Sequence, residues 1–216
     1  IRKKSDVEYK YKKQSGGHGQ YGHVKMTFEP SGDMDTPYVF EQTVVGGAVP
    51  KNFFPAVEKG IAESVKKGPL AAYPVTGIKA VLYDGSYHPV DSSEMAFKVA
   101  TQQAFKKGIM EAKPVLLEPI ATLKVVVPEG YTGDVMGELN KRRARVMGMN
   151  PTDNGYQEIV ADIPYLELYG YNATLRSMTS GSGTFSYEFA RYEQAPDDVA
   201  AKQIEERASK LVEVEE

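Results

Sequence analysis

The chain has 216 residues, a hydrophobic fraction of 41%, a charged fraction of 25% and a formal net charge of -3. These values are ordinary for a folded protein and exclude a chain that is disordered throughout. Cysteine is absent, which excludes disulfide bonds, thiolate zinc ligands and a cysteine nucleophile. The sequence shows neither an apolar run long enough for a membrane span nor a secretion signal, so we expect a soluble cytoplasmic protein.

Length and charge distribution both indicate an organisation in parts. The length suits two domains, because domains commonly run to roughly 100 to 150 residues. Basic residues gather in residues 1–30, whereas acidic residues dominate the end of the chain, 197–216. A basic segment permits local contact with nucleic acid although the net charge is negative; a solvated charged surface is the alternative.

Alternation of apolar and polar residues predicts a β-hairpin near the start of the chain. The stretches 7–13 and 24–28 both alternate with a period of two, which is typical of half-buried strands. Residues 15–22 between them are too rich in glycine to continue either strand, so we expect a loop at the end of a sheet. An apolar run at 38–45 predicts a third strand, and apolar residues at helical spacing predict a helix over 53–65.

A strand, a tight turn and a second helix follow in the sequence. Residues 78–83 predict the strand and 84–89 a projecting turn. The Asp-Ser-Ser-Glu segment at 91–94 supplies side-chain oxygens that can accept from the free amides of a first helical turn. We therefore expect a helix from there through Phe105. Two prolines around an apolar centre at 114–119 mark the expected domain boundary.

The second half of the sequence predicts the element order βαββαβ. In chain order these are a strand at 121–127, a helix at 132–143, strands at 146–149 and 157–163, a helix at 165–178 and a strand at 184–192. That order indicates a ferredoxin-like sandwich of an antiparallel sheet and two helices. A last helix at 197–211 carries a narrow apolar stripe, so we expect it to pack back on the first domain. The predicted fold class is α+β, divided into 1–116, 117–194 and a C-terminal helix at 195–216.

Several motifs that could suggest nucleotide binding or catalysis do not fit their context. Residues 17–22 match G-x-G-x-x-G, but that fingerprint needs a following helix to hold a pyrophosphate, and here a strand follows. The P-loop motif is absent from the sequence, so no P-loop GTPase is expected within it. Ser180 has no base beside it and is expected in a helix-ending loop. A metal site or an RNA-cleaving acid–base pair stays open for three histidines, against ordinary loop residues: His18, His23 and His88.

Two turns are expected to project from the first domain, one within 14–22 and one at 84–88. Their His, Gln and Tyr side chains can donate to phosphates or 2′-hydroxyls and stack on unpaired bases, and glycine lets a nucleic-acid strand come close. The residues by themselves therefore permit an RNA-contacting surface. The alternative from the same residues is two tight hairpins without a partner.

Longer runs of residues resemble domain IV of elongation factor G. In chain order these runs are Gln14-Ser15-Gly16-Gly17, then 19–24, Pro50-Lys51, 55–61, and 84–88 leading into 90–98. The second half is similar to domain V of the same factor through 117–120, 133–135, Gly170-Tyr171 and 175–177. The resemblance covers essentially the whole chain. It implies a mixed α/β first domain of the ribosomal-protein S5 domain-2-like type and a ferredoxin-like second domain.

The resemblance also implies contact with RNA on the ribosome. Domain IV of the family reaches the decoding centre, where its tip loops contact the tRNA–mRNA pair during translocation; the matching residues are Gln14, Ser15, Gly16, Gly17, His18, Gly19, Gln20, Tyr21, Ser86, Tyr87 and His88. Domain V of the family contacts large-subunit ribosomal RNA, and the matching residues are Arg176, Ser177, Ser180 and Ser182. We expect no enzyme activity, metal or cofactor in this chain, because GTP and Mg belong to an upstream domain of the family. A monomer with no membrane partner is expected.

The sequence departs from the family's usual residues at a few positions. The family usually has arginine at the place of His18, glutamine and arginine at Ser180 and Ser182, and glycine at Ala72 and Ala144. Fewer fixed positive charges then face RNA, and each lost phosphate contact flattens the salt dependence of binding. A specialised paralogue that acts in ribosome recycling or ribosome protection is therefore the alternative to a translocase.

Overall fold

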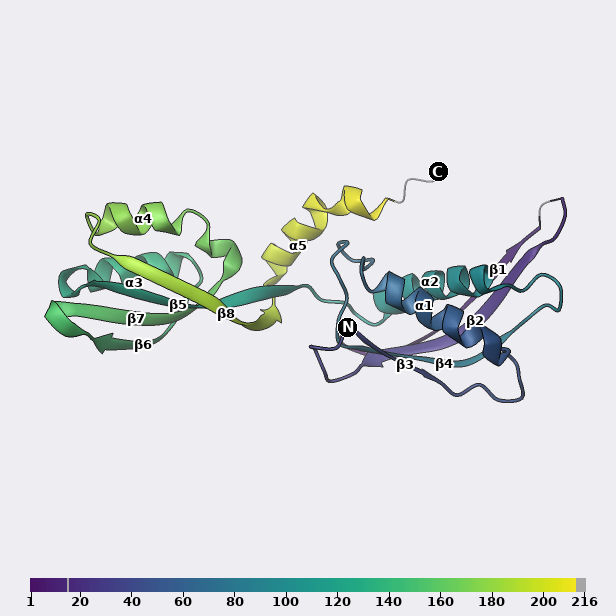
Figure 1. Ribbon diagram of the computed structural model, residues 1–216. Helices are drawn as coiled ribbons and strands as arrows, with labels where there is room; N and C mark the ends of the chain where they lie inside the picture. The colour runs from purple at the N-terminus through teal and green to yellow at the C-terminus, as the bar shows by residue number, and fades with distance from the viewer. Residues whose placement is uncertain (15, 213–216) are drawn as a thin grey trace. The chain divides into compact units, whose positions relative to one another are not determined.

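The structure is a computed structural model that describes residues 1–14 and 16–212 (Figure 1). The chain divides into two compact units, one formed by Ile1–Val115 together with the segment from Asp197 onward, and one by Leu116–Pro196. Each unit has its own four-stranded sheet and its own apolar core. The α+β class predicted from the sequence is confirmed. No helix within the described ranges is long and apolar enough to cross a membrane.

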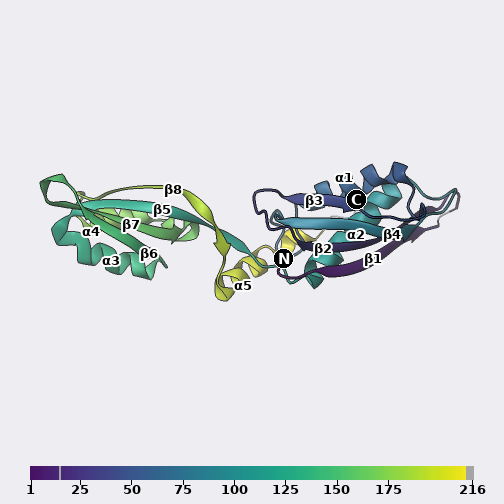
Figure 2. The same cartoon turned by 90° about the horizontal axis from the view of Figure 1, so that it is seen from below.

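The first unit is a sheet with two helices packed on one face (Figures 1 and 2). Its elements are β1 (Ser5–Lys13), β2 (Gln20–Pro30), β3 (Tyr38–Gln42), α1 (Phe54–Ser64), β4 (Ile78–Ser86) and α2 (Glu94–Glu111). The strand order is β1-β2-β4-β3, with β2 antiparallel to both neighbours and β3 parallel to β4. Helix α1 makes the crossover that two parallel neighbours require.

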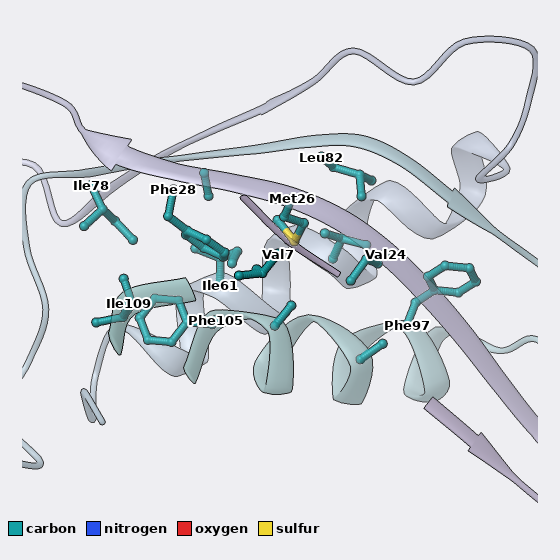
Figure 3. Packing of buried hydrophobic residues seen from close by; sticks show 14 of the residues in the cluster. Val7, Val24, Met26, Phe28, Ile61, Ile78, Leu82, Phe97, Phe105 and Ile109 are labelled. Atoms are coloured by element: carbon teal, nitrogen blue, oxygen red, sulfur yellow. The ribbon is translucent and has the colours of Figure 1, made fainter. Parts of the chain in front are cut away.

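The core of the first unit lies between β2 and the two helices (Figure 3). Val24, Met26 and Phe28 alternate along β2 and are fully buried, as the period of two predicted. The ring of Phe28 meets that of Phe105 from α2 edge to face, with centroids 5.8 Å apart. Burying each such side chain contributes about 1.5 to 3 kcal/mol, so β2 is the strand that the unit is built around.

The second strand begins earlier than its alternation predicted. Lys13 pairs with Gln20, so β2 starts at Gln20 and the glycine-rich loop is confined to 14–19. Gly22 lies within the strand, in contact with the start of α2. A β-carbon at this position would lie 2.5 Å from the carbonyl oxygen of Ala96, a distance that no side chain tolerates. Glycine is therefore required there by close packing and not by a turn.

The second unit has the predicted ferredoxin-like order βαββαβ. Its elements are β5 (Leu117–Pro128), α3 (Thr132–Lys141), β6 (Arg145–Pro151), β7 (Tyr156–Pro164), α4 (Tyr171–Met178) and β8 (Thr184–Gln194). The strand order is β6-β7-β5-β8 and each neighbouring pair is antiparallel. Alternate residues of β5, including Leu123 and Val125, are fully buried in its core.

The helix predicted over 165–178 is wrong in its first part. A short 3₁₀ helix, η4 (Tyr165–Leu168), precedes α4, and Gly170 between them has a φ of 72°. The guanidinium of Arg142 donates to the carbonyl oxygens of Glu167 and Tyr169, at 2.6 and 2.9 Å. Because these carbonyls are satisfied by a side chain, the backbone can leave the helical path here.

The C-terminal helix packs on the first unit, as expected, but it is shorter than 197–211. It consists of α5 (Asp197–Glu206) followed by a 3₁₀ turn, η5 (Ala208–Leu211). Arg207 Nε donates to the carbonyl oxygen of Ala71 at 2.7 Å, and its guanidinium lies 3.7 Å from the centre of the Tyr73 ring. The Tyr73 hydroxyl donates to Gln203 at 2.8 Å. Arg207 therefore joins the helix to the loop that follows α1.

Replacing Ala72 with glycine should stabilise the first unit. Ala72 has a φ of 60°, in the left-handed region where a β-carbon is strained, whereas Ala144 is not among the residues with positive φ. We expect Ala72→Gly to raise the free energy of unfolding by about 0.5 to 1 kcal/mol, and the control Ala144→Gly to lower it by a similar amount. Urea denaturation measures both, and a loss of stability in Ala72→Gly would contradict the strain.

Replacing Tyr171 with phenylalanine should stabilise the second unit. The Tyr171 hydroxyl is buried and has no hydrogen-bond partner among the described residues, and burial raises its pKa to about 12. We expect Tyr171→Phe to raise the free energy of unfolding by about 1 kcal/mol, because an unsatisfied buried hydroxyl is removed.

The same substitution should change the response to alkaline pH. The folded state keeps this hydroxyl protonated up to about pH 12, while the ordinary pKa of tyrosine is 10.0, so the wild type loses stability as the pH rises between these values. That part of the loss should be absent from Tyr171→Phe. Denaturation measured at several alkaline pH values tests this, and parallel profiles for the two proteins would refute it.

Candidate RNA interface at the end of the first sheet

Two turns of the first unit lie side by side where β2 begins and β4 ends (Figure 1). One is the glycine-rich turn between β1 and β2, and the other joins β4 to α2. The backbone N–H of Tyr21 donates to the carbonyl oxygen of Asp91 at 2.9 Å, and the Ser92 hydroxyl donates to the carbonyl oxygen of Tyr21 at 2.8 Å. We call residues 14–21 together with 86–92 the tip. Ser15 lies outside the described residues.

Most of the predicted contact residues of the tip are open to solvent. The exposed ones are Gln14, Gly16, Gly17, His18, Gln20, Tyr87 and His88, and the partly buried ones are Gly19, Tyr21 and Ser86. At Gly19 a β-carbon would lie 2.9 Å from a carboxylate oxygen of Asp91, so glycine allows the two turns to approach. The tip thus combines exposed polar side chains with a tightly joined backbone.

His88 is held by its own turn. Its Nδ1 accepts hydrogen bonds from the backbone N–H groups of Val90 and Asp91, at 3.2 and 3.0 Å, and its backbone N–H donates to the Ser92 hydroxyl at 2.9 Å. The imidazole lies beside Tyr21, with ring centroids 6.4 Å apart. Within the described ranges no residue bonds to its Nε2, which is therefore available to a ligand.

His23 is buried beneath the tip and bonds through both ring nitrogens. Its Nε2 lies 3.0 Å from a carboxylate oxygen of Glu8, and its Nδ1 lies 2.7 Å from the Ser86 hydroxyl. That hydroxyl lies 2.6 Å from the hydroxyl of Tyr21. The hydrogen bond from His23 lowers the pKa of Glu8. The three histidines do not converge, and the described residues contain no cluster of three or more groups that could hold a metal.

Glu8 was not among the residues that sequence reasoning assigned to this site. In the hairpin register Glu8 faces Lys25, and Lys10 faces His23. Glu8 and His23 are therefore diagonal neighbours on adjacent strands, and their side chains bond across that diagonal. A sequence pattern alone gives that register only if the length of the turn is known, and the strand was predicted to begin too late. Asp91 was recognised as helix-cap chemistry, whereas its carbonyl oxygen in fact joins the two turns.

Basic side chains of β1 lie next to the tip. Lys10, Lys12 and Lys13 pair in the strand register with His23, Tyr21 and Gln20, and all three lysines are exposed. They form no ion pair within the described part of the chain. Unpaired lysines beside an exposed loop supply the positive charge that phosphate contacts require.

The predicted site of the second unit is a helix end beside a shallow hollow. Arg176 and Ser177 are exposed on α4, while Ser180 has a φ of 51° and the Ser182 hydroxyl donates to the carbonyl oxygen of Thr179. Ser182 is therefore occupied in ending the helix. The hollow has a volume of about 350 Å³ and is lined by Asn172, Arg176, Gly181, Gly183, Thr184 and Phe185. Among the described residues, Arg176 is thus the one charged side chain that lines it.

Comparison with known proteins identifies both units. Residues 1–113 match the family model for elongation factor G, domain IV, and residues 115–203 match that for the elongation factor G C-terminus. An elongation factor G-like protein of Thermotoga maritima is 50% identical over 209 residues, which are 97% of this chain and 30% of that protein. A crystal structure of a Thermus thermophilus protein is 44% identical with a TM-score of 0.82, over 97% of this chain and 31% of that one.

The chain therefore spans less than a third of the length of these relatives. The two matched regions are non-catalytic parts of the factor, and neither is its GTPase domain. Both regions match in the expected order and together they cover most of the sequence. The chain belongs to the elongation factor G family, of which it comprises domain IV and the C-terminal region.

Proposed function

We propose that this chain is the ribosome-contacting part of a translation GTPase of the elongation factor G type. Its tip would contact the tRNA–mRNA pair in the decoding centre and so promote translocation. The observation that carries the proposal is the junction of two exposed turns by the Tyr21 and Ser92 hydrogen bonds, next to the unpaired lysines of β1. Such a surface offers donors, aromatic faces and positive charge to RNA.

The tip would act by occupying space and not by bond-making chemistry. A factor shifts a ribosomal equilibrium only if it binds one state more tightly than the other, and that requires a surface that keeps its shape under contact. The close approach of Gly22 to Ala96 and the bonds between the turns provide that stiffness. GTP and Mg would act in a GTPase domain elsewhere in the full-length protein.

The second unit would bind large-subunit ribosomal RNA at the end of α4. Arg176 is exposed there and lines the hollow beside the turn at 180–183. A guanidinium can bond a phosphate through two N–H groups at once, which suits this position. Because the Ser182 hydroxyl is already bonded to the backbone, we assign the RNA contact chiefly to Arg176 and Ser177.

A role in ribosome recycling or ribosome protection is the second candidate. The observation that favours it is the exposed His18, which stands in the tip where the family usually has arginine. A chimera in which this chain replaces the matching segment of the Thermotoga maritima relative separates the candidates. A translocase chimera should move tRNA in a single-round assay, whereas a recycling or protection factor should split ribosomes or release a bound inhibitor without that movement.

Removing the imidazole of His88 should slow tRNA movement. We expect His88→Ala in the chimera to lower the rate of movement on the order of tenfold, the effect of losing about 1.4 kcal/mol of contact energy, while ribosome-stimulated GTP hydrolysis stays nearly unchanged. Met110→Ala is the control, because Met110 is an exposed side chain near the C-terminal end of α2 and lies outside the tip. Equal rates for the wild-type chimera and His88→Ala would remove the tip from the mechanism.

Neutralising the β1 lysines should flatten the salt dependence of ribosome binding. Each phosphate contact contributes a slope of roughly -0.7 to -0.9 to the plot of log affinity against log salt concentration. We expect Lys12→Gln and Lys13→Gln together to reduce the magnitude of that slope by about 1.4 to 1.8. Lys67→Gln, an exposed lysine beyond the end of α1, is the control and should leave it unchanged. An unaltered slope in the double variant would place the phosphates elsewhere.

A further inference from the structure

Four side chains from three strands form a continuous hydrogen-bonded chain beneath the tip. It runs from Glu8 on β1 to His23 on β2, to Ser86 on β4 and back to Tyr21 on β2, with distances of 3.0, 2.7 and 2.6 Å. His23 at the centre is 8% exposed, whereas the side chain of Glu8 is 61% exposed. The sheet register fixes the arrangement, because His23 and Ser86 are direct partners across β2 and β4.

Each of these hydrogen bonds has one donor and one acceptor, so fixing the donor at one end of the series fixes the donor in every other bond. An ionised carboxylate can only accept, and therefore Nε2 of His23 donates to Glu8. While the imidazole is neutral this is its one N–H, so Nδ1 accepts a hydrogen bond from the Ser86 hydroxyl. The oxygen of Ser86 then accepts from the hydroxyl of Tyr21.

The direction of these bonds determines which hydrogen bonds Tyr21 can offer to a ligand, and His88 beside it differs. In this arrangement the Tyr21 hydroxyl donates to Ser86, so its oxygen can only accept a further hydrogen bond. His88 has the opposite character, because its Nδ1 accepts two backbone N–H groups and its proton must lie on Nε2. The two rings are neighbours, with centroids 6.4 Å apart, so the acceptor and the donor belong to adjacent side chains of the tip.

We propose that His23 is a positioning residue that sets the hydrogen-bond polarity of the tip, making Tyr21 an acceptor for RNA and leaving donation to His88. A phosphate offers only acceptors and suits His88, whereas a ribose 2′-hydroxyl or a base amine can donate and suits Tyr21. The identity of the ligand as RNA rests on the proposed function. The polarity itself is a property of this chain and can be measured without a ribosome.

A carboxylate, a histidine and a serine in series also occur in serine hydrolases, where the serine oxygen attacks a carbonyl carbon. In this chain the Ser86 oxygen lies 2.6 Å from the Tyr21 hydroxyl oxygen, and in the arrangement above its lone pair accepts that hydrogen bond. Ser86 is also partly buried at the end of β4. The arrangement therefore serves to hold Tyr21 and not to expose a nucleophile.

The first test reads the protonation of the His23 ring by nitrogen-15 NMR of the whole chain. At about pH 8, where imidazole is ordinarily neutral, we expect a protonated Nε2 and an unprotonated, hydrogen-bonded Nδ1. His18→Asn and His88→Asn assign the other rings. Glu8→Gln retains an acceptor and should keep this signature, whereas Glu8→Ala should produce a mixture of the two tautomers. A proton on Nδ1 in the wild type, or a signature that survives Glu8→Ala, would overturn the proposal.

The second test asks whether the acceptor at Tyr21 is used. In the chimera, Tyr21→Phe should slow tRNA movement by about two- to tenfold, the range for one neutral hydrogen bond, while its His23 signature stays that of the wild type. An unchanged rate would overturn the role of Tyr21 as an acceptor for RNA. Failure of the proposed function would look different, because His88→Ala would then also leave movement unchanged although the tautomer is as expected.

Discussion

The contact between the first residues of β2 and the first residues of α2 is the constraint on which the tip depends. Gly22 has no side chain, so the strand can lie against the Ala96 carbonyl, and this brings the β1–β2 turn and the β4–α2 turn together. The backbone bonds of Tyr21 and Ser92 then join them. The exposed His88, Gln20 and His18 are displayed on this junction. A side chain at Gly22 would collide with the Ala96 backbone and so force the two turns apart, although Gly22 is not itself a predicted RNA contact.

In the second unit, two arginine side chains hold the segment that precedes α4. Arg142 and Arg143 follow α3, where Arg143 has a φ of 57° and bonds Glu118 through both terminal nitrogens, at 2.9 and 3.1 Å, and Glu167 at 3.0 Å. Arg142 holds the carbonyl oxygens on either side of Leu168. These bonds offset a strained backbone and fix the segment ahead of α4. These bonds therefore also help to fix the position of α4, the helix that carries Arg176.

Periodicity and cap chemistry predicted most of the fold because local rules dominate there. The alternation in β2, the Ser93 cap of α2 and the βαββαβ order all depend on neighbouring residues, and the structure confirms them. The break before α4 has a local signal in Gly170, which was not used, whereas the bonds from Arg142 that satisfy the backbone there come from a residue distant in sequence. For the site, the residues of both turns followed from their resemblance to a family, whereas Glu8 depended on a strand register that begins at Gln20.

The course of β2 bears on how the tip could carry mechanical load. The strand runs from Gln20 to Pro30, and its ladder with β1 extends from Gln20 to Phe28. Tyr21, which bonds the second turn, therefore belongs to the same continuous strand as the buried Phe28. A force directed along β2 would load many of the β1–β2 hydrogen bonds in shear at the same time and would not break them one after another. Force applied at one loop would thus be shared among many hydrogen bonds of the sheet.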